Sequence, residues 1–380
     1  MLILLSLLSL LSWLYLLFLR GSFWRTGPRL PPAGSLECWP AVAAVVPARD
    51  ESTVIERSLS SLRRLDYPGR FFIVLIDDGS RDGTAELAAD VAAGPGHPMD
   101  IVAGKPLPEG WTGKVWAMAQ GLERIASLRP EPHYVWFTDA DVEHDPQALR
   151  DLVWQAENRS LSLVSNMAML HCASFWERLS IPAFVFFFCK LYPFRQVNAP
   201  RSSVAAAAGG SMLAHLKALR QAGGLEQIRG ELIDDCALAR LLKAGGNIWL
   251  GLSVHSRSVR PYGFADIWRM VARSAYTQLQ CSPFWLATAV CGMALIYLMP
   301  VIGFAAGCLS GNYAAAALGA TAWIFMLLAY RPMMRFYRQP DWLALLLPAA
   351  ALLYTAMTID SARRHWQGKG GAWKGRIKPN

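Results

Sequence analysis

The sequence contains little charge and no cysteine pattern that indicates a metal or disulfide framework. Of its 380 residues 17% are charged and 53% are hydrophobic, and the mean hydropathy is +0.25. These values lie outside the usual range of soluble proteins and predict membrane segments. The seven cysteines include no Cys-x-x-Cys pair, which excludes the common structural zinc motifs and favours a reducing compartment. No charged residue lies in the middle of the long apolar runs, which argues against a transport pathway.

The positive charge gathers beside the apolar segments. The net charge is +9, and arginine and lysine cluster at residues 20–29, 331–338 and 363–378. Basic residues that flank membrane segments are attracted to anionic lipid head groups. We therefore expect an anionic phospholipid surface, and no nucleic acid, as the partner of these clusters.

Residues 2–19 form an almost uninterrupted apolar run that is long enough to span a bilayer as a helix. A cleaved signal peptide is the alternative, but no basic segment precedes the run and no small-x-small site follows it. We predict an uncleaved anchor at 1–20 and a linker at 21–38. Arg20, Arg25 and Arg29 follow the run, so the positive-inside rule predicts that the next domain is cytoplasmic.

Three further apolar stretches lie at about 285–309, 313–330 and 342–359. Their lengths predict two or three spans within residues 281–361, and Pro300 or Pro348 is a candidate for breaking one of them. If all three cross, the basic tail 362–380 lies outside, against the positive-inside rule. We expect a cytoplasmic tail, and the alternative that one stretch is re-entrant or interfacial stays open.

Between these apolar ends, residues 39–280 show the pattern of an α/β domain. Short apolar strands are predicted at 41–46 and 71–76, with a helix between them that Ser52 can cap. Polar loops follow both strands, at 47–51 and 77–84. Alternating strands and helices of this kind predict an open parallel sheet, in which ligands bind outside the carboxyl ends of the strands.

Asp139 and Asp141 follow a third predicted strand, 134–137. Two carboxylates one residue apart at the end of a buried strand need a compensating cation. A divalent metal that carries a diphosphate suits them, because Mg²⁺ and Mn²⁺ bind carboxylate oxygens and leave positions open for phosphate. The alternative is an acidic turn that caps the next helix at Asp145. His144 is predicted to be a surface or turn residue.

Four ordered segments together resemble the inverting family-2 glycosyltransferases. They are Val46-Pro47-Ala48-Arg49-Asp50-Glu51, Asp77-Asp78-Gly79-Ser80, Asp139-Ala140-Asp141 and Asp234-Asp235-Cys236-Ala237-Leu238. The resemblance covers about residues 41–273. It implies a Rossmann-like GT-A fold and a hexosyltransferase that uses a nucleotide sugar, for which we expect a UDP-sugar, together with Mn²⁺ or Mg²⁺.

The resemblance also assigns expected roles to individual residues. Asp235 is the expected catalytic base, and the expected metal ligands are Asp141 and Asp139. Lys114, which follows Gly113 at a predicted helix start, is expected to meet the donor diphosphate. The other expected nucleotide-sugar contacts are Pro47, Arg49, Glu51, Asp77, Asp78 and Asp139, and further phosphate or acceptor contacts are expected from Asp234, Gly210, Arg269 and Arg273.

Within this family the chain looks most like the hopene-associated membrane glycosyltransferases, through residues 108–114, 234–240 and the tail segment 373–376. This narrower resemblance implies the bacterial inner membrane and a lipid acceptor, such as a hopanoid. Residues 181–191 fit either an interfacial helix that receives this lipid or an ordinary core helix.

Two rival functions stay open. The first is a processive polysaccharide synthase, but the Gln/Arg-x-x-Arg-Trp motif of such enzymes is degraded here, with Ser274 in place of the tryptophan. The second is a non-catalytic membrane scaffold that binds a nucleotide. A scaffold does not need a separate acid such as Asp235 far downstream of a metal motif.

Overall fold

The structure is a computed structural model that describes residues 1–368, so the tail segment 373–376 lies outside the described residues. The chain divides into two compact units. The sheet unit contains residues 27–171 and 196–260. The helical unit contains residues 1–26, 172–195 and the described residues from 261 on. Each unit is therefore built from segments that are far apart in the sequence.

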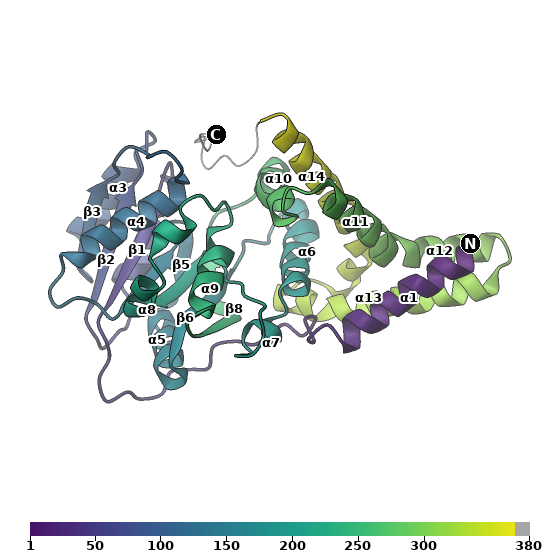
Figure 1. The fold of residues 1–380 in the computed structure, drawn as a ribbon, viewed down its shortest axis with the longest axis horizontal. Helices are drawn as coiled ribbons and strands as arrows, with labels where there is room; N and C mark the ends of the chain where they lie inside the picture. The colour runs from purple at the N-terminus through teal and green to yellow at the C-terminus, as the bar shows by residue number, and fades with distance from the viewer. Residues whose placement is uncertain (369–380) are drawn as a thin grey trace. The chain divides into compact units, whose positions relative to one another are not determined.

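The sheet unit is organised around one eight-stranded sheet with the order β3-β2-β1-β4-β7-β6-β8-β5 (Figure 1). Its strands are β1 (Val42–Ala48), β2 (Phe71–Asp77), β3 (Met99–Ala103), β4 (Tyr134–Thr138), β5 (Val142–His144), β6 (Leu161–Met169), β7 (Ser211–His215) and β8 (Asn247–Ser258). The strands β1, β2 and β4 are rich in β-branched and aromatic residues and almost entirely buried, as strands covered on both faces should be.

The sheet is mixed, so the predicted open parallel sheet holds for β3-β2-β1-β4 and for the β6–β8 pair but not for β7 and β5. Strands β3, β2, β1 and β4 are parallel, whereas β7 runs antiparallel between β4 and β6, and β5 runs antiparallel to β8. A parallel neighbour needs a long crossover, which the helices after β1, β2 and β3 provide. The α/β class that the sequence predicts is confirmed.

Helices cover this sheet. They are α2 (Ile55–Arg63), α3 (Thr84–Ala93), α4 (Gly113–Ala126), α5 (Ala148–Arg159), α8 (Leu216–Gln221) and α9 (Asp234–Lys243), with a 3₁₀ turn, η1, at Leu225–Ile228; α7 (Phe194–Val197) lies at a boundary between the units. The core joins apolar residues of β1, β2, β4, α2 and α5. In α4, a Cβ at Gly121 would lie 2.4 Å from Val45 Cγ1, so glycine lets this helix approach β1 closely.

The helical unit consists of α1 (Leu2–Phe18), α6 (Phe175–Leu191), α10 (Phe264–Gln278), α11 (Pro283–Met293), α12 (Met299–Leu309), α13 (Tyr313–Phe336) and α14 (Leu347–Trp366). A π-helical turn, η2 (Ala294–Leu298), joins α11 to α12, and a 3₁₀ turn, η3 (Asp341–Leu346), precedes α14. Three of the resulting helical stretches, Pro283–Leu309, Tyr313–Phe336 and Asp341–Trp366, are long and apolar enough to cross a membrane. Leu2–Phe18 is a shorter apolar helix.

Neither candidate proline interrupts these stretches. Pro348 is in the first turn of α14, where its missing N–H has no helical partner to lose. Pro300 is the second residue of α12, which follows the π-helical turn, and it cannot donate to the carbonyl of Ile296 four residues before it. The indole Nε1 of the buried Trp13 in α1 donates to that carbonyl at 2.8 Å instead.

The segment 181–191 belongs to α6, which packs within the helical unit. Ile181, Val185 and Phe186 are buried, and the hydroxyl of Tyr354 in α14 donates to the Ser180 carbonyl at 3.0 Å. Ser174 and Glu177 form a capping box at the start of the helix. The structure therefore gives α6 the buried face of a core helix.

Candidate active site

Five chain segments meet at one edge of the sheet because of strand direction. Strands β1, β2 and β4 are parallel and end together at Ala48, Asp77 and Thr138. Strand β7 is antiparallel to β4 and begins beside its end, with Ser211 in register with Thr138. Strand β8 ends beside the start of β5. The loops that leave or enter these strands carry most of the predicted site residues.

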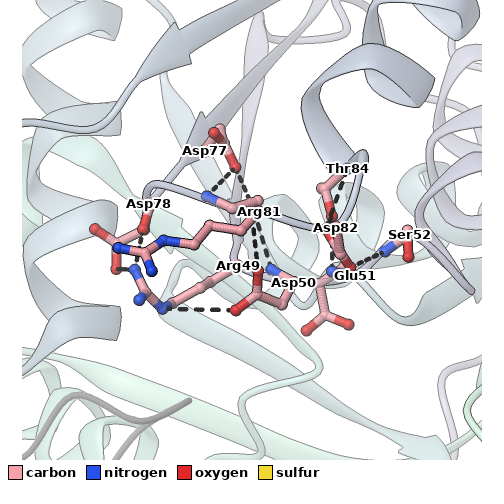
Figure 2. A network of polar contacts seen from close by, with 10 residues as sticks. Arg49, Asp50, Glu51, Ser52, Asp77, Asp78, Arg81, Asp82 and Thr84 are labelled. Atoms are coloured by element: carbon pink, nitrogen blue, oxygen red, sulfur yellow. Dashed lines mark hydrogen bonds and ion pairs between the residues drawn. The ribbon is translucent and has the colours of Figure 1, made fainter.

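The loops after β1 and β2 are bound to each other by polar contacts (Figure 2). The amide of Asp50 donates to Ser80 Oγ at 3.0 Å, and the amide of Arg81 donates to Asp50 Oδ1 at 2.9 Å. Thr84 Oγ1 accepts from the amide of Glu51 at 2.8 Å. Asp50 has a φ of 50°, a left-handed conformation that aspartate tolerates better than most residues. The two loops therefore form one preorganised surface.

Arg49 and the fully buried Asp78 form the centre of this surface. The Arg49 guanidinium donates to the Asp78 carbonyl, and Arg49 Nη1 lies 3.6 Å from Asp78 Oδ2. Asp77 accepts a 2.5 Å hydrogen bond from the Ser80 hydroxyl, which closes the turn after β2. Pro47 is buried within β1, in register with Ile76.

Lys114, at the start of α4, is surrounded by acids from three other segments. Its Nζ lies 2.8 Å from Asp139 Oδ1 and 3.5 Å from Asp234 Oδ2. Only 19% of the Lys114 side chain is exposed. Burial lowers the pKa of Lys114, but the charges of Asp139 and Asp234 outweigh this effect and raise it above its ordinary value. Lys114 is therefore a permanent cation of the site.

Asp235 is held in place by backbone donors at the start of α9. Its Oδ2 accepts from the amide of Gly209 at 3.0 Å, and its Oδ1 accepts from the amide of Cys236 at 2.7 Å. Burial, followed by the charge of Asp234, raises the pKa of Asp235 to about 6. A carboxylate with this pKa can accept a proton near neutral pH.

Gly209 lies where these charged groups converge. A Cβ at this position would be 2.9 Å from Lys114 Nζ, 3.7 Å from Asp235 Oδ2 and 3.8 Å from Asp139 Oδ2. Any side chain here would displace the lysine. The glycine therefore lets the side chains of Lys114, Asp139 and Asp235 approach the backbone closely at this point. Its neighbour Gly210 accepts a 3.0 Å hydrogen bond from the Thr138 hydroxyl through its carbonyl.

Asp141 pairs with Arg260, which the sequence motifs do not indicate. Arg260 Nε lies 2.9 Å from Asp141 Oδ2, and the same guanidinium also donates to Glu51. Burial lowers the pKa of Arg260, but Glu51 and Asp141 keep it above its ordinary value. Arg260 is 119 positions from Asp141 and 209 positions from Glu51 in the sequence. The pairing of β5 with β8 brings Arg260 to Asp141.

His144 is buried, so its prediction as a surface or turn residue is wrong. Its Nε2 is 2.8 Å from the Thr138 hydroxyl, and its Nδ1 is 2.8 Å from the Ser256 hydroxyl. Burial lowers the pKa of His144 to about 3, which leaves the ring neutral. Its role in the fold is to join β5 to β4 and β8 beneath the acidic motif.

Arg269 and Arg273 belong to the other unit. Both are exposed on α10 of the helical unit, and Arg269 pairs with Asp266 at 2.5 Å. The sheet unit brings the other predicted residues together in groups. The first group is Lys114, Asp139, Asp234 and Asp235. The second is Glu51 and Asp141, and the third, on the joined loops, is Arg49, Asp77 and Asp78.

Asp139 and Asp141 fit a divalent ion only if its other ligands come from elsewhere. Among residues 1–368 there is no group of three or more His, Cys, Asp or Glu side chains arranged to hold a metal. Two carboxylates suit Mg²⁺ or Mn²⁺, because these ions keep positions for water and substrate phosphate oxygens. In this structure Lys114 and Arg260 supply the positive charge that the two carboxylates require.

The fold of the chain is that of the GT-A glycosyltransferases. Among solved structures, the mannosyltransferase PcManGT from Pyrobaculum calidifontis, in complex with GDP-Man and Mn²⁺, is similar over 96% of this chain and 99% of that chain, with a TM-score of 0.57 and 19% identity. A weaker similarity, with a TM-score of 0.40 and 16% identity, covers 63% of this chain and 79% of glucosyl-3-phosphoglycerate synthase from Mycobacterium tuberculosis in complex with Mg²⁺ and UDP.

Residues 43–223 match the profile of Glycosyl transferase family 2. The chain thus contains a family 2 domain, and the protein is a glycosyltransferase. A comparison with proteins of curated function finds no match. The matched residues include Lys114, Asp139 and Asp141 but end before Asp235 and Arg260.

Proposed function

We propose that the protein transfers one sugar from a nucleotide-sugar donor to a hydroxyl group of a membrane lipid, with inversion at the anomeric carbon. The observation that carries this proposal is the group formed by Lys114, Asp139 and Asp235. It combines a permanent cation, an acid suited to a metal–diphosphate and a second acid with a raised pKa, all beside the backbone of Gly209.

The joined loops after β1 and β2 bind the nucleoside of the donor in this proposal. Arg49 and Asp77 are partly exposed on these loops, whereas Asp78 is fully buried. We therefore assign Asp78 to positioning the Arg49 guanidinium and leave direct contacts with the base and ribose to the more exposed groups. PcManGT, which has the same fold, is known in complex with GDP-Man and Mn²⁺, which supports a nucleotide sugar as the donor class.

Lys114 and the acidic motif stabilise the leaving group. Asp139 and Asp141 would hold Mg²⁺ or Mn²⁺, which neutralises charge on the departing diphosphate when it is bound. Lys114 is a fixed cation beside Asp139 and at the start of α4, where the helix dipole also favours anions. Negative charge that develops as the sugar departs therefore meets positive groups that are already in place.

Asp235 acts as the general base. The acceptor hydroxyl oxygen forms a bond to the anomeric carbon, while the bond from that carbon to the diphosphate oxygen breaks. The hydroxyl proton passes to Asp235, and the electron pair of the broken bond leaves on the diphosphate. The hydrogen bonds from Gly209 and Cys236 fix the carboxylate orientation during this transfer.

The helical unit is the reason for choosing a lipid acceptor. Its three long apolar stretches fit a membrane protein, and α6 adds exposed aromatic residues, Phe175 and Trp176, at its start. We propose that the domain 39–280 is cytoplasmic at the bacterial inner membrane, with the anchor 1–20 and the segments 281–361 in the bilayer. A hopanoid or a related lipid is the finer acceptor class in this proposal.

The test is product formation by the full chain in detergent. Purified protein is incubated with Mn²⁺, a panel of nucleotide sugars and total bacterial lipid, and glycolipids are followed by mass spectrometry. We expect one lipid that gains a single sugar mass, and we expect Asp235→Asn to abolish it. A long polymer would establish a processive synthase instead. Nucleotide binding without product from any donor would support the scaffold function.

A further inference from the structure

Arg260 is the last residue of the sheet unit and lies outside the segments that identify the family. It follows Ser258, the last residue of β8, and the register of that strand with β5 places it beside the acidic motif. The amide of Val259 donates to the Asp141 carbonyl at 2.8 Å. The backbone of this segment is therefore tied to the same residue that the Arg260 side chain contacts.

The Arg260 guanidinium bridges two acids that come from different loops. Its Nε is 2.9 Å from Asp141 Oδ2, and its Nη2 donates to Glu51. The Ser258 hydroxyl lies 3.3 Å from the same Asp141 oxygen. The exposed fractions of the Asp141 and Glu51 side chains are 15% and 9%, so water compensates little of their charge. Arginine suits such a bridge, because its planar group presents donors on two edges.

This contact competes with a metal for the same carboxylate. Asp141 carries one negative charge, and one cation is enough to compensate it. A divalent ion and the guanidinium of Arg260 would therefore compete for this carboxylate. Without a nucleotide, Arg260 has the advantage, because its backbone already holds it at the site. A donor diphosphate changes this balance, since its negative charges attract both the metal and the released guanidinium.

On the basis of the function proposed above, we propose that Arg260 is a counter-cation that occupies Asp141 and Glu51 in the empty site and makes binding of the divalent metal depend on the nucleotide. When the diphosphate arrives, Arg260 releases Asp141 and turns toward the phosphates, so that the Asp141 carboxylate would then be free to hold the ion. Arg260 is thus a positioning residue for the donor. Because linkage is reciprocal, the metal strengthens nucleotide binding by the same factor that the nucleotide strengthens metal binding.

The experiment measures Mn²⁺ binding by the full chain in detergent, through the electron paramagnetic resonance signal of free Mn²⁺. Each titration is made without nucleotide, with UDP and with GDP. For the wild type we expect at least about a tenfold tighter Mn²⁺ dissociation constant with the fitting nucleoside diphosphate. For Arg260→Gln we expect about tenfold tighter Mn²⁺ binding than wild type without nucleotide, and therefore a much smaller effect of the nucleotide.

Arg257→Gln is the matched control. Arg257 is three residues earlier, within β8, and pairs with Asp145 at 2.8 Å instead of with Asp141. We expect it to behave as the wild type. Arg260→Lys keeps one positive charge but cannot bridge two acids on two edges, so its Mn²⁺ affinity should lie between those of wild type and Arg260→Gln. This variant also provides the measurement if Arg260→Gln does not fold.

Unchanged Mn²⁺ affinity without nucleotide in the Arg260 variants would overturn the inference. So would the absence of Mn²⁺ binding by any of these proteins with either nucleotide, because Asp141 would then not be a metal ligand. Neither result would contradict the transferase function, provided that the wild type still forms glycolipid. After the second result, this glycolipid would have to form without a metal. Loss of all product with normal metal coupling would contradict the function and leave the role of Arg260 intact.

Discussion

Lys114 and Arg260 compensate the charges of different acids in the site. Lys114 compensates Asp139 and Asp234, and Arg260 compensates Asp141 and Glu51. Asp235 receives backbone amides as its hydrogen-bond donors, and its pKa is raised while Lys114 stays charged. When neighbouring acids have such different environments, one can accept a proton while the others stay ionised and bind cations.

This difference predicts how the transfer rate depends on pH. With a pKa of about 6, Asp235 should lose most of its base form below pH 6, so the rate should fall about tenfold for each further pH unit. Above pH 7 the rate should be constant. The measurement is the single-turnover rate between pH 5 and 8 with saturating donor, with nucleotide binding over the same range as the control. A constant rate across this range would contradict the role of Asp235.

The same raised pKa has the opposite consequence for stability. A carboxyl group whose folded pKa exceeds its unfolded value stabilises the fold below the unfolded pKa, near 4, and this stability is lost as the pH rises through about 6. Asp235→Asn should therefore melt at a higher temperature than the wild type at pH 7. Below pH 4 this difference should disappear, which a thermal unfolding series can check.

Residues that lie at strand ends within short motifs could be identified from the sequence, whereas residues that depend on strand pairing could not. Asp139, Lys114 and Asp235 each follow or begin a recognisable element, and the structure brings them together. Arg260 and His144 meet their partners through the pairing of β5 with β8, between residues more than 100 positions apart. No local pattern specifies that pairing, because β5 is only three residues long.

At the scale of the elements, a side-chain hydrogen bond joins α1 to the α11–α12 stretch of the helical unit. Trp13 Nε1 satisfies the carbonyl that Pro300 leaves without a helical donor, and the Trp13 ring packs edge-on against Tyr297 at 5.9 Å. Small residues support close packing nearby, since a Cβ at Gly303 would lie 2.4 Å from Ser6 Oγ. In apolar surroundings an unsatisfied carbonyl is costly.

Trp13→Phe should therefore destabilise the helical unit by about 1–3 kcal/mol, because it keeps an aromatic ring but removes the indole donor. The measurement is thermal unfolding of the detergent-purified protein, followed by the helical circular dichroism signal. Trp285→Phe is the control, since about half of the Trp285 side chain is exposed in α11. Equal melting temperatures for the two variants would show that the Trp13 hydrogen bond contributes little.

The sequence predicts the elements best where composition dominates. The apolar runs predict the three long C-terminal stretches, and the β-branched segments predict β1, β2 and β4. The antiparallel direction of β7 and the continuity of the helix through Pro300 depend on tertiary partners, so they could not be predicted. A proline indicates a missing donor, but only the structure shows that Trp13 replaces it.

At the scale of the whole molecule, the proposed topology places different cysteines on different sides of the membrane. Cys38 is exposed in the segment that precedes β1, and Cys308 is exposed near the end of the Pro283–Leu309 stretch. If the sheet unit is cytoplasmic, that stretch carries Cys308 to the outer face. Cys291, the ninth of the 27 residues of the same stretch, should lie within the bilayer.

We expect a membrane-impermeant maleimide to modify Cys308 in intact cells and Cys38 only after the membrane is permeabilised. Variants that each retain one of the seven natural cysteines make the assignment direct, and mass spectrometry reports the modification. Cys291 serves as the internal control, because it should stay unmodified in both cases. Modification of Cys38 in intact cells would place the sheet unit outside and reverse the topology.

The interleaving of the two units also has a consequence for how such a gene can change. Residues 172–195, which contain α6, lie inside the coding region of the sheet unit but belong to the helical unit. A single recombination block that covers 27–260 would thus carry α6 into a foreign set of helices. To exchange one unit without the other, recombination between related genes needs two further breakpoints, one on each side of α6. We therefore expect the two units to be inherited together.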